Sequence, residues 1–251
     1  MFKSRGFARF CLRAIMAALS CVATHAAAGT PLPGMADPNL QTCLTEHAVR
    51  NGWQFAEQVV QLDCARRRIV MLHGVEGLPN LAQLDLSANE IVDVAPLFGL
   101  RNLTRLNLSG NRMLPVFQVR PILDQNFSLT SLGLNGIEVG NFNNLGALFN
   151  PQLGRPYDLI ELDLGNTKLT DSNGGKSLEF LGRFPNLAKL NVAGNAISFI
   201  GAINMTPRLM ELDLSANEIV EVAPLFGLRN LTRLNLSGNR MLPVFQVRPI
   251  L

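Results

Sequence analysis

Few residues in this sequence could carry out catalysis or bind a metal, and their spacing does not suit either role. Outside the N-terminal segment the histidines are His47 and His73, and they lack the spacing of a zinc site. Gly175-Lys176-Ser177 matches the end of a phosphate-binding loop, but the glycine required five positions earlier is Thr170. No G-x-S-x-G, H-E-x-x-H or EF-hand motif occurs. We therefore expect neither an enzyme nor a cofactor or metal site.

Cys43 and Cys64 are the two cysteines beyond residue 28. In an exported chain two cysteines most simply form a disulfide, and two buried free thiols are the alternative. Closing a loop of about twenty residues would stabilise the fold by about 3 kcal/mol. We expect the pair Cys43–Cys64 to be a disulfide, provided that the chain is exported.

Residues 1–28 have the layout of a secretory signal peptide. A basic stretch without acidic residues precedes an apolar run from Ala14 to Ala23, and small residues follow up to Ala28. The apolar run is too short to anchor the chain in a bilayer. Ala18-Leu19-Ser20-Cys21 also resembles a lipobox, so a lipid anchor at Cys21 is the alternative. We expect a secreted, periplasmic or cell-surface protein without a transmembrane anchor in the mature chain.

The positive charge of the sequence lies in this N-terminal segment. Cleavage after Ala28 removes four positive charges and no negative ones, so the net charge changes from +3 to −1. The mature chain has no basic run beyond Arg66-Arg67-Arg68. We therefore do not expect nucleic acid as a partner. Because 47% of the residues are hydrophobic and 16% are charged, the chain should fold.

A leucine pattern repeats along the rest of the chain. The pair L-x-L, with Cys64 and Val192 in place of the second leucine in two units, begins at Leu62, Leu84, Leu106, Leu132, Leu162, Leu190, Leu212 and Leu234, at intervals of 22, 22, 26, 30, 28, 22 and 22 residues. Alternation in L-x-L predicts a short strand with both leucines on one face. One coil cannot bury its hydrophobic face alone, whereas stacked coils build a parallel sheet over a continuous core.

An asparagine follows the strand in five of these units, at Asn89, Asn111, Asn195, Asn217 and Asn239. It stands where the chain bends away from the strand, so a buried amide there can bond backbone groups that the bend leaves unpaired. Ile137 and Thr167 replace it in the two units of greatest length. Together with their insertions they make the region 124–189 irregular. Such insertions are either functional loops or loops that the fold simply tolerates.

The pattern L-x-L-x-x-N-x-I resembles the leucine-rich repeat, and its 22-residue spacing resembles the internalin-like bacterial exported proteins. The resemblance implies an α/β repeat solenoid with a curved parallel sheet on its concave face and short helical or irregular segments on its convex side. We expect a linker and cap at 29–61 and about eight coils at 62–251. The cap should contain a helix that begins at Asp37-Pro38 and ends near Gly52, with Leu40, Leu44 and Val49 covering the first coil.

The last two units repeat an earlier part of the sequence. Residues 84–123 and 212–251 agree at 39 of 40 positions, with Asp93 against Glu221 as the exception. Agreement at solvent-facing positions is not required by the fold, so a recent duplication is the better explanation. Because the second copy stops at Leu251, we expect an incomplete, frayed final coil.

The candidate binding surface consists of the residues that flank the first leucine of each unit and point away from the core. They are Gln83, Asp85, Arg105, Asn107, Ser131, Gly133, Glu161, Asp163, Lys189, Asn191, Glu211, Asp213, Arg233 and Asn235. A wide polar wall suits a protein or glycan better than a small molecule. Charges alternate along Glu161, Lys189, Glu211 and Arg233, so the wall could instead merely neutralise itself. We expect a protein partner on the concave face; the alternative is a structural cell-envelope protein without a discrete ligand site.

Overall fold

The computed structural model of the chain describes residues 29–139, 145–146, 148–149, 156–171 and 178–240. Four features predicted above lie outside the described residues: the signal peptide, the lipobox at Cys21, Gly175-Lys176-Ser177 and the final segment 241–251. Pro31–Leu251 form one compact unit, separate from residues 1–30.

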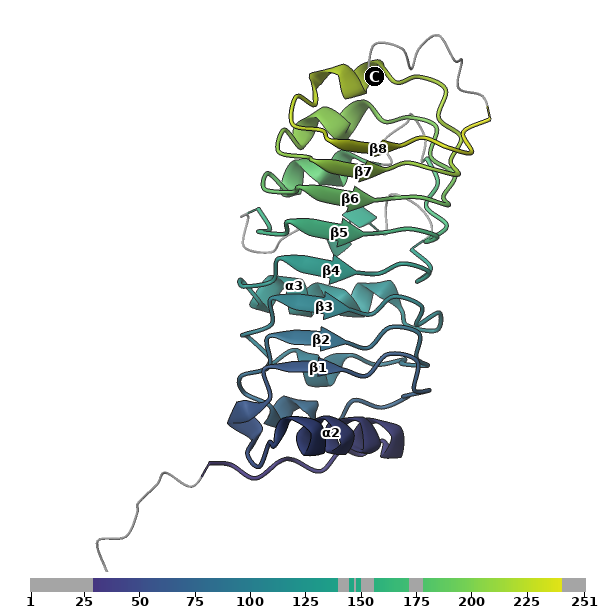
Figure 1. Ribbon diagram of the computed structural model, residues 1–251. Coiled ribbons are helices and arrows are strands. Elements are labelled where there is room, and N and C mark those ends of the chain that lie inside the picture. The colour runs from purple at the N-terminus through teal and green to yellow at the C-terminus, as the bar shows by residue number, and fades with distance from the viewer. Residues whose placement is uncertain (1–28, 140–144, 147, 150–155, 172–177, 241–251) are drawn as a thin grey trace, which may run out of the picture. The chain divides into compact units, whose positions relative to one another are not determined.

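An open parallel sheet runs the length of this unit, and its strands follow one another in chain order (Figure 1). In the described residues the strands are β1 Gln61–Asp63, β2 Gln83–Asp85, β3 Arg105–Asn107, β4 Ser131–Gly133, β5 Glu161–Asp163, β6 Lys189–Asn191, β7 Glu211–Asp213 and β8 Arg233–Asn235. The first leucine of each unit lies opposite that of the next, from Leu62 and Leu84 through to Leu234. The predicted strands, register and repeat solenoid are confirmed.

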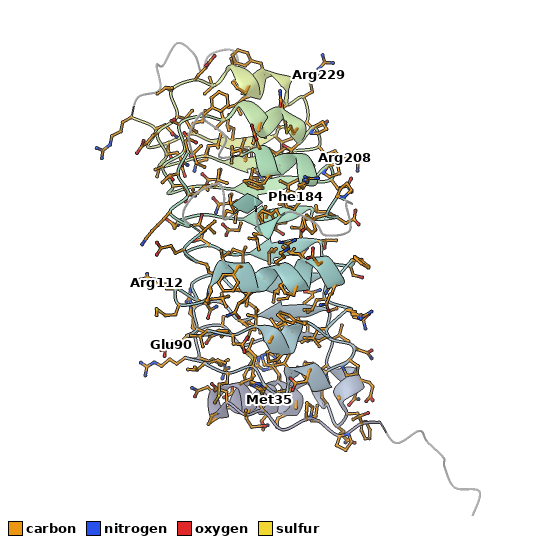
Figure 2. The ribbon with its side chains drawn as sticks, turned by 180° about the vertical axis from the view of Figure 1, so that it is seen from behind. Met35, Glu90, Arg112, Phe184, Arg208 and Arg229 are labelled. Carbon is orange, nitrogen blue, oxygen red and sulfur yellow. A yellow bond between two sulfur atoms is a disulfide. The ribbon has the colours of Figure 1, made fainter. Side chains whose placement is uncertain are left out.

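The side of the coils behind the sheet is built from short helices (Figure 2). The 3₁₀ segments are η1 Ala56–Gln58, η2 Val75–Gly77, η3 Ala95–Leu97, η4 Val116–Val119, η5 Glu179–Arg183, η6 Gly201–Met205 and η7 Ala223–Gly227. An α-helix, α3 Arg120–Gln125, follows η4 in the 26-residue unit. This arrangement agrees with the predicted short helical convex side.

One hydrophobic core extends through the stack of coils, and the side chains that fill it are larger in the longest coils. The leucines of the strands are buried along most of the sheet, while Leu234 and Leu236 of the last described coil are partly buried. In the two units of greatest length Phe149, Tyr157 and Phe184 pack together, with ring centroids 5.0–6.3 Å apart. Larger side chains fill the extra width that longer coils enclose.

Helix α2, Pro38–Asn51, lies across the first coil as a cap (Figure 1). Asp37 accepts hydrogen bonds at Oδ1 from the backbone amides of Asn39 and Leu40, and Gly52 ends the helix at a φ of 70°. Leu40 and Leu44 are buried as predicted, whereas Val49 is 80% exposed and does not cover the core. Val49 follows Leu44 by five residues and therefore points to another side of the helix.

A disulfide ties this cap to the first coil, as predicted. Cys43 of α2 is bonded to Cys64, which directly follows β1, with their Cα atoms 5.8 Å apart. The Oδ2 atom of Asp37 also accepts from the backbone amides of Val70 and Met71 in the same coil. Burial acts to raise the pKa of Asp37. The hydrogen bonds from the backbone amides of Val70, Met71, Leu40 and Asn39 outweigh this effect and lower the pKa below 3.8.

The repeated asparagines bridge consecutive coils through their side-chain amides. Asn111 is fully buried, donates to the carbonyls of Leu86 and Leu108, and accepts from the amide of Ile91. Asn89, Asn195, Asn217 and Asn239 repeat this pattern. At the replaced position Thr167 donates its hydroxyl to the carbonyl of Leu164. The predicted role of the asparagine, bonding backbone groups at the bend, is therefore present.

Candidate binding face

The strand face is defined here by two rows of side chains that point away from the core. The first row holds the residue before each first leucine: Gln61, Gln83, Arg105, Ser131, Glu161, Lys189, Glu211 and Arg233. The second row holds the residue after it: Asp63, Asp85, Asn107, Gly133, Asp163, Asn191, Asp213 and Asn235. In each strand these two residues are more exposed than the leucine between them. All fourteen residues of the predicted binding surface thus lie on one continuous face.

Ion pairs connect the charged residues of the first row. Glu211 lies 3.4 Å from Lys189 Nζ and 3.1 Å from Arg233 Nη1, as the alternating signs predict. Glu161 instead lies 3.6 Å from Arg105 Nη1, across β4, and accepts from the Ser131 hydroxyl. Because the Ser131 side chain on β4 is short, the Arg105 side chain on β3 extends past it to Glu161 on β5. These pairs are solvent-exposed, so each is worth at most about 1 kcal/mol.

Asparagine–aspartate pairs connect the second row. Asn107 donates to Asp85 at 3.0 Å, Asn191 to Asp163 at 2.9 Å, and Asn235 to Asp213 at 3.1 Å. Each aspartate also accepts from the backbone amide two residues later, at Ser87, Gly165 and Ser215. These partners are neutral, so they orient the carboxylates without cancelling their charge.

Two equivalent aspartates of this row differ in acidity. Burial raises the pKa of Asp163 above its ordinary 3.8, although Gly165, Asn135 and Asn191 donate to its carboxylate and act in the opposite direction. Burial also acts to raise the pKa of Asp213, but hydrogen bonds from Ser215 and Asn235 outweigh it, and the pKa lies below 3.8. A serine hydroxyl serves Asp213, whereas the corresponding position beside Asp163 is a glycine.

The strand face is hollowed in two adjoining places. One hollow, of about 350 Å³, lies over β1 to β5, and the other, of about 460 Å³, lies over β5 to β8. Glu161 and Asp163 line both. Gly133 forms part of the floor of the first: a Cβ there would lie 2.5 Å from Asn107 Oδ1 and 2.9 Å from Ser109 Oγ. The side chains of Asn107 and Ser109 therefore cover this position, and a residue larger than glycine would displace them.

A third set of polar side chains, which the sequence analysis did not single out, belongs to the same face. Ser109 and Asn135 follow the second leucine of their units. The Ser109 hydroxyl accepts from the amide of Asn135, and the side chain of Asn135 donates to Asp163 at 3.2 Å. The sequence contained a signal for this set, because the residue that follows the second leucine of each unit is mostly small and polar.

The described part of the strand face does not bring together a catalytic set. His47 lies on the cap, where its Nε2 is 2.9 Å from the carbonyl oxygen of Asp63 and its ring stacks on Trp53. Among the described residues no three His, Cys, Asp or Glu side chains are placed to hold a metal ion. No helix in the described ranges is both long and apolar enough to cross a membrane.

Comparisons with known proteins agree with this architecture. The leucine-rich repeat family model matches residues 61–113 and 185–241. Internalin C2 of Listeria monocytogenes strain 4b F2365 is similar at a TM-score of 0.59 and 24% identity, over 83% of this chain and 99% of that one. Internalin F of the same strain is similar at 0.51 and 19%, over 90% and 77% of the two chains. No curated protein matches the sequence significantly.

Proposed function

We propose that this chain, which folds as a leucine-rich repeat solenoid similar to those of the internalins, is exported and binds another protein through its strand face. The observation that carries the proposal is a polar face that continues over β1 to β8 and is hollowed along its length. We further propose that the chain acts by binding and not by catalysis, with residues 29–61 as linker and cap and 62–251 as the solenoid.

The shape of the face favours a macromolecular partner over a small molecule. Small molecules are bound in concave sites that enclose most of their surface and are lined mainly by apolar groups. Here the two hollows adjoin on one broad sheet and are lined by charged and amide side chains above the leucines. A protein segment that contacts both hollows would bury far more surface than a ligand held in either.

Export is supported by the cap. The disulfide between Cys43 and Cys64 joins α2 to the first coil, and structural disulfides are typical of oxidising compartments. The proposed route is the signal peptide at 1–28. N-terminal sequencing of the exported protein tests this. Gly29 at the N-terminus supports cleavage after Ala28, whereas a lipidated Cys21 at the N-terminus would show that the chain is a lipoprotein.

Photo-crosslinking tests the location of binding. A photoreactive amino acid is placed at Lys189 on the strand face in one variant and at Arg112 in another. Figure 2 shows Arg112 on a flank, beside the loops that leave the strands. The two variants are exposed to extracts of cell envelopes and cell surfaces, with increasing unlabelled wild-type chain as competitor.

We expect a crosslinked protein from the Lys189 variant that the competitor abolishes, and no such product from the Arg112 variant. Products from Arg112 alone would move the binding site off the strand face. Fractionation of cells decides between this proposal and the structural alternative: a released chain supports binding, and a detergent-resistant envelope chain without a saturable partner contradicts it.

A further inference from the structure

Charge is distributed unequally between the two rows of the strand face. The charged members of the first row are three cations and two glutamates, and each cation lies within 3.6 Å of a glutamate. The second row carries four carboxylates and no cation, at Asp63, Asp85, Asp163 and Asp213. None of these four forms a salt bridge with another described residue. The second row is therefore an acidic stripe beside a first row whose cations are paired with glutamates and exceed them by one.

The hydrogen bonds along this stripe hold the carboxylates in place while leaving their charge uncompensated. Asp85 accepts from Asn107 and from the amide of Ser87, and Asp163 accepts from Asn135, Asn191 and the amide of Gly165. Every one of these donors is neutral. Carboxylates that are pre-oriented in this way lose little side-chain freedom when a cation binds.

A hollow opens beside the middle of the stripe. It is lined by Asp85, Glu161 and Asp163, and Gly133 lies in its floor beneath the side chains of Asn107 and Ser109. At about 350 Å³ the hollow is at the lower end of the sizes, about 300–1,000 Å³, that hold a bound group. A long cationic side chain in this hollow would face Asp85 and Asp163, neither of which forms a salt bridge with another described residue.

The spacing of the carboxylates excludes a compact cation and favours a chain. Strands in a sheet lie about 4.8 Å apart, so Asp85 and Asp163 are separated by about 14 Å and Asp163 and Asp213 by about 10 Å. No three acidic groups of the described residues approach closely enough for a metal ion. An extended peptide advances about 3.3 Å per residue, so the first distance corresponds to about four residues, which keeps both side chains on one face of the peptide. The second distance corresponds to about three residues, which places the side chains on opposite faces, so Asp213 is not contacted in the same way.

We propose that the strand face binds an extended basic segment of its protein partner, with lysine or arginine side chains facing Asp85 and Asp163 and one of them entering the hollow over β1 to β5. This inference rests on the proposed function and names the chemistry of the partner. The segment runs across the strands, along the axis of the solenoid, with basic residues at about positions i and i+4.

Synthetic peptides test the inference on the full chain. The probe is an eight-residue peptide of threonine and valine with arginines at positions 2 and 6, which reproduces the spacing of about four residues on one face of the peptide. A second peptide has the same composition with its two arginines adjacent, so that they point to opposite faces, and a third has glutamate in place of arginine. Affinities are measured by isothermal titration calorimetry at low ionic strength, where surface charges are least screened.

We expect the spaced arginine peptide to bind at least about tenfold more tightly than the clustered one, and the glutamate peptide not to bind. Asp85→Asn and Asp163→Asn should each weaken the spaced peptide by about tenfold, since each removes one charged contact. Glu90→Gln is the matched control, because it removes the same charge from an exposed position on a flank (Figure 2). It should leave the affinity unchanged.

Three results would overturn the inference. They are equal binding of the spaced and clustered peptides, equal weakening by Glu90→Gln, and no binding of the spaced peptide to the wild-type chain. The proposed function is judged separately by the crosslinking at Lys189. A partner that crosslinks there but lacks a basic segment leaves protein binding intact and removes only the basic-segment inference.

Discussion

The side-chain amide of Asn107 donates to the carboxylate of Asp85 on the preceding strand, with 3.0 Å between Nδ2 and Oδ2. Asn235 and Asp213 repeat this contact at 3.1 Å in the duplicated segment 212–251. The pairing satisfies polar groups on the face without supplying a positive charge. It therefore explains how a face rich in hydrogen bonds keeps an acidic stripe available to a partner.

Loss of one bridging asparagine should destabilise the solenoid strongly. Asn111→Ala removes hydrogen bonds to Leu86, Leu108 and Ile91 inside the core, and unsatisfied buried groups cost about 1–3 kcal/mol each. We expect the free energy of unfolding, measured by urea denaturation, to fall by about 3 kcal/mol. Asn111→Thr should cost less, because a threonine hydroxyl serves the same position at Thr167.

Asn204→Ala is the control for this measurement. Asn204 is exposed, so its substitution should change the free energy of unfolding by less than about 0.5 kcal/mol. Similar losses for Asn111→Ala and Asn204→Ala would show that the asparagine ladder is not a main source of stability.

Only one side of α2 should contribute to the free energy of unfolding through the cap. Leu44→Ala empties a buried position and is expected to lower the free energy of unfolding by about 3 kcal/mol. Val49→Ala changes a side chain that is 80% exposed, and its effect should stay below about 0.5 kcal/mol. Both variants can be compared by thermal and urea unfolding. A large loss for Val49→Ala would mean that this residue does cover the core.

The sequence predicts the fold well because the repeat fixes two independent features of each coil. The L-x-L alternation sets which side chains face the core, and the constant spacing sets the register, so Leu84 lies opposite Leu106 as expected. The error at Val49 has a simple cause. Its apolar type suggested burial, but Leu40, Leu44 and Ala48 recur at four-residue steps and Val49 falls outside that stripe.

The candidate face was only partly predictable. Its residues follow from the repeat, but side-chain reach does not, so Arg105 pairs with Glu161 across Ser131 where the sequence suggested Lys189 as the partner. The depth of the hollow at Gly133 likewise depends on where the side chains of Asn107 and Ser109 lie above it. Such contacts join residues more than twenty positions apart and carry no local sequence signal.

The disulfide should contribute measurably to stability. Cys43 and Cys64 are 21 residues apart, and a loop of that length corresponds to about 3 kcal/mol in the chain-entropy model. We expect Cys43→Ala with Cys64→Ala to lower the free energy of unfolding by that amount in urea. Dithiothreitol should lower the stability of the wild-type chain and leave the double variant unchanged. An effect of the reductant on both would point to a cause other than this bond.

Asp163 and Asp213 should respond oppositely to pH. The pKa of Asp163 is raised in the folded state, so its stabilising contribution is complete below 3.8 and is lost as the pH rises through the folded value. The pKa of Asp213 is lowered, so its contribution is complete above 3.8 and is lost as the pH falls through the folded value. The two aspartates occupy the same position in their coils, so the comparison isolates their surroundings.

Urea unfolding of Asp163→Asn, Asp213→Asn and the wild-type chain between about pH 3 and 6 measures both trends against the ordinary aspartate pKa. With rising pH the stability of Asp163→Asn should increase relative to the wild type, while that of Asp213→Asn should decrease relative to it. The absolute costs of the substitutions do not matter, because only the slopes are compared. Slopes of the same sign for both variants would contradict this explanation, in which burial dominates the pKa of Asp163 and hydrogen bonding dominates the pKa of Asp213.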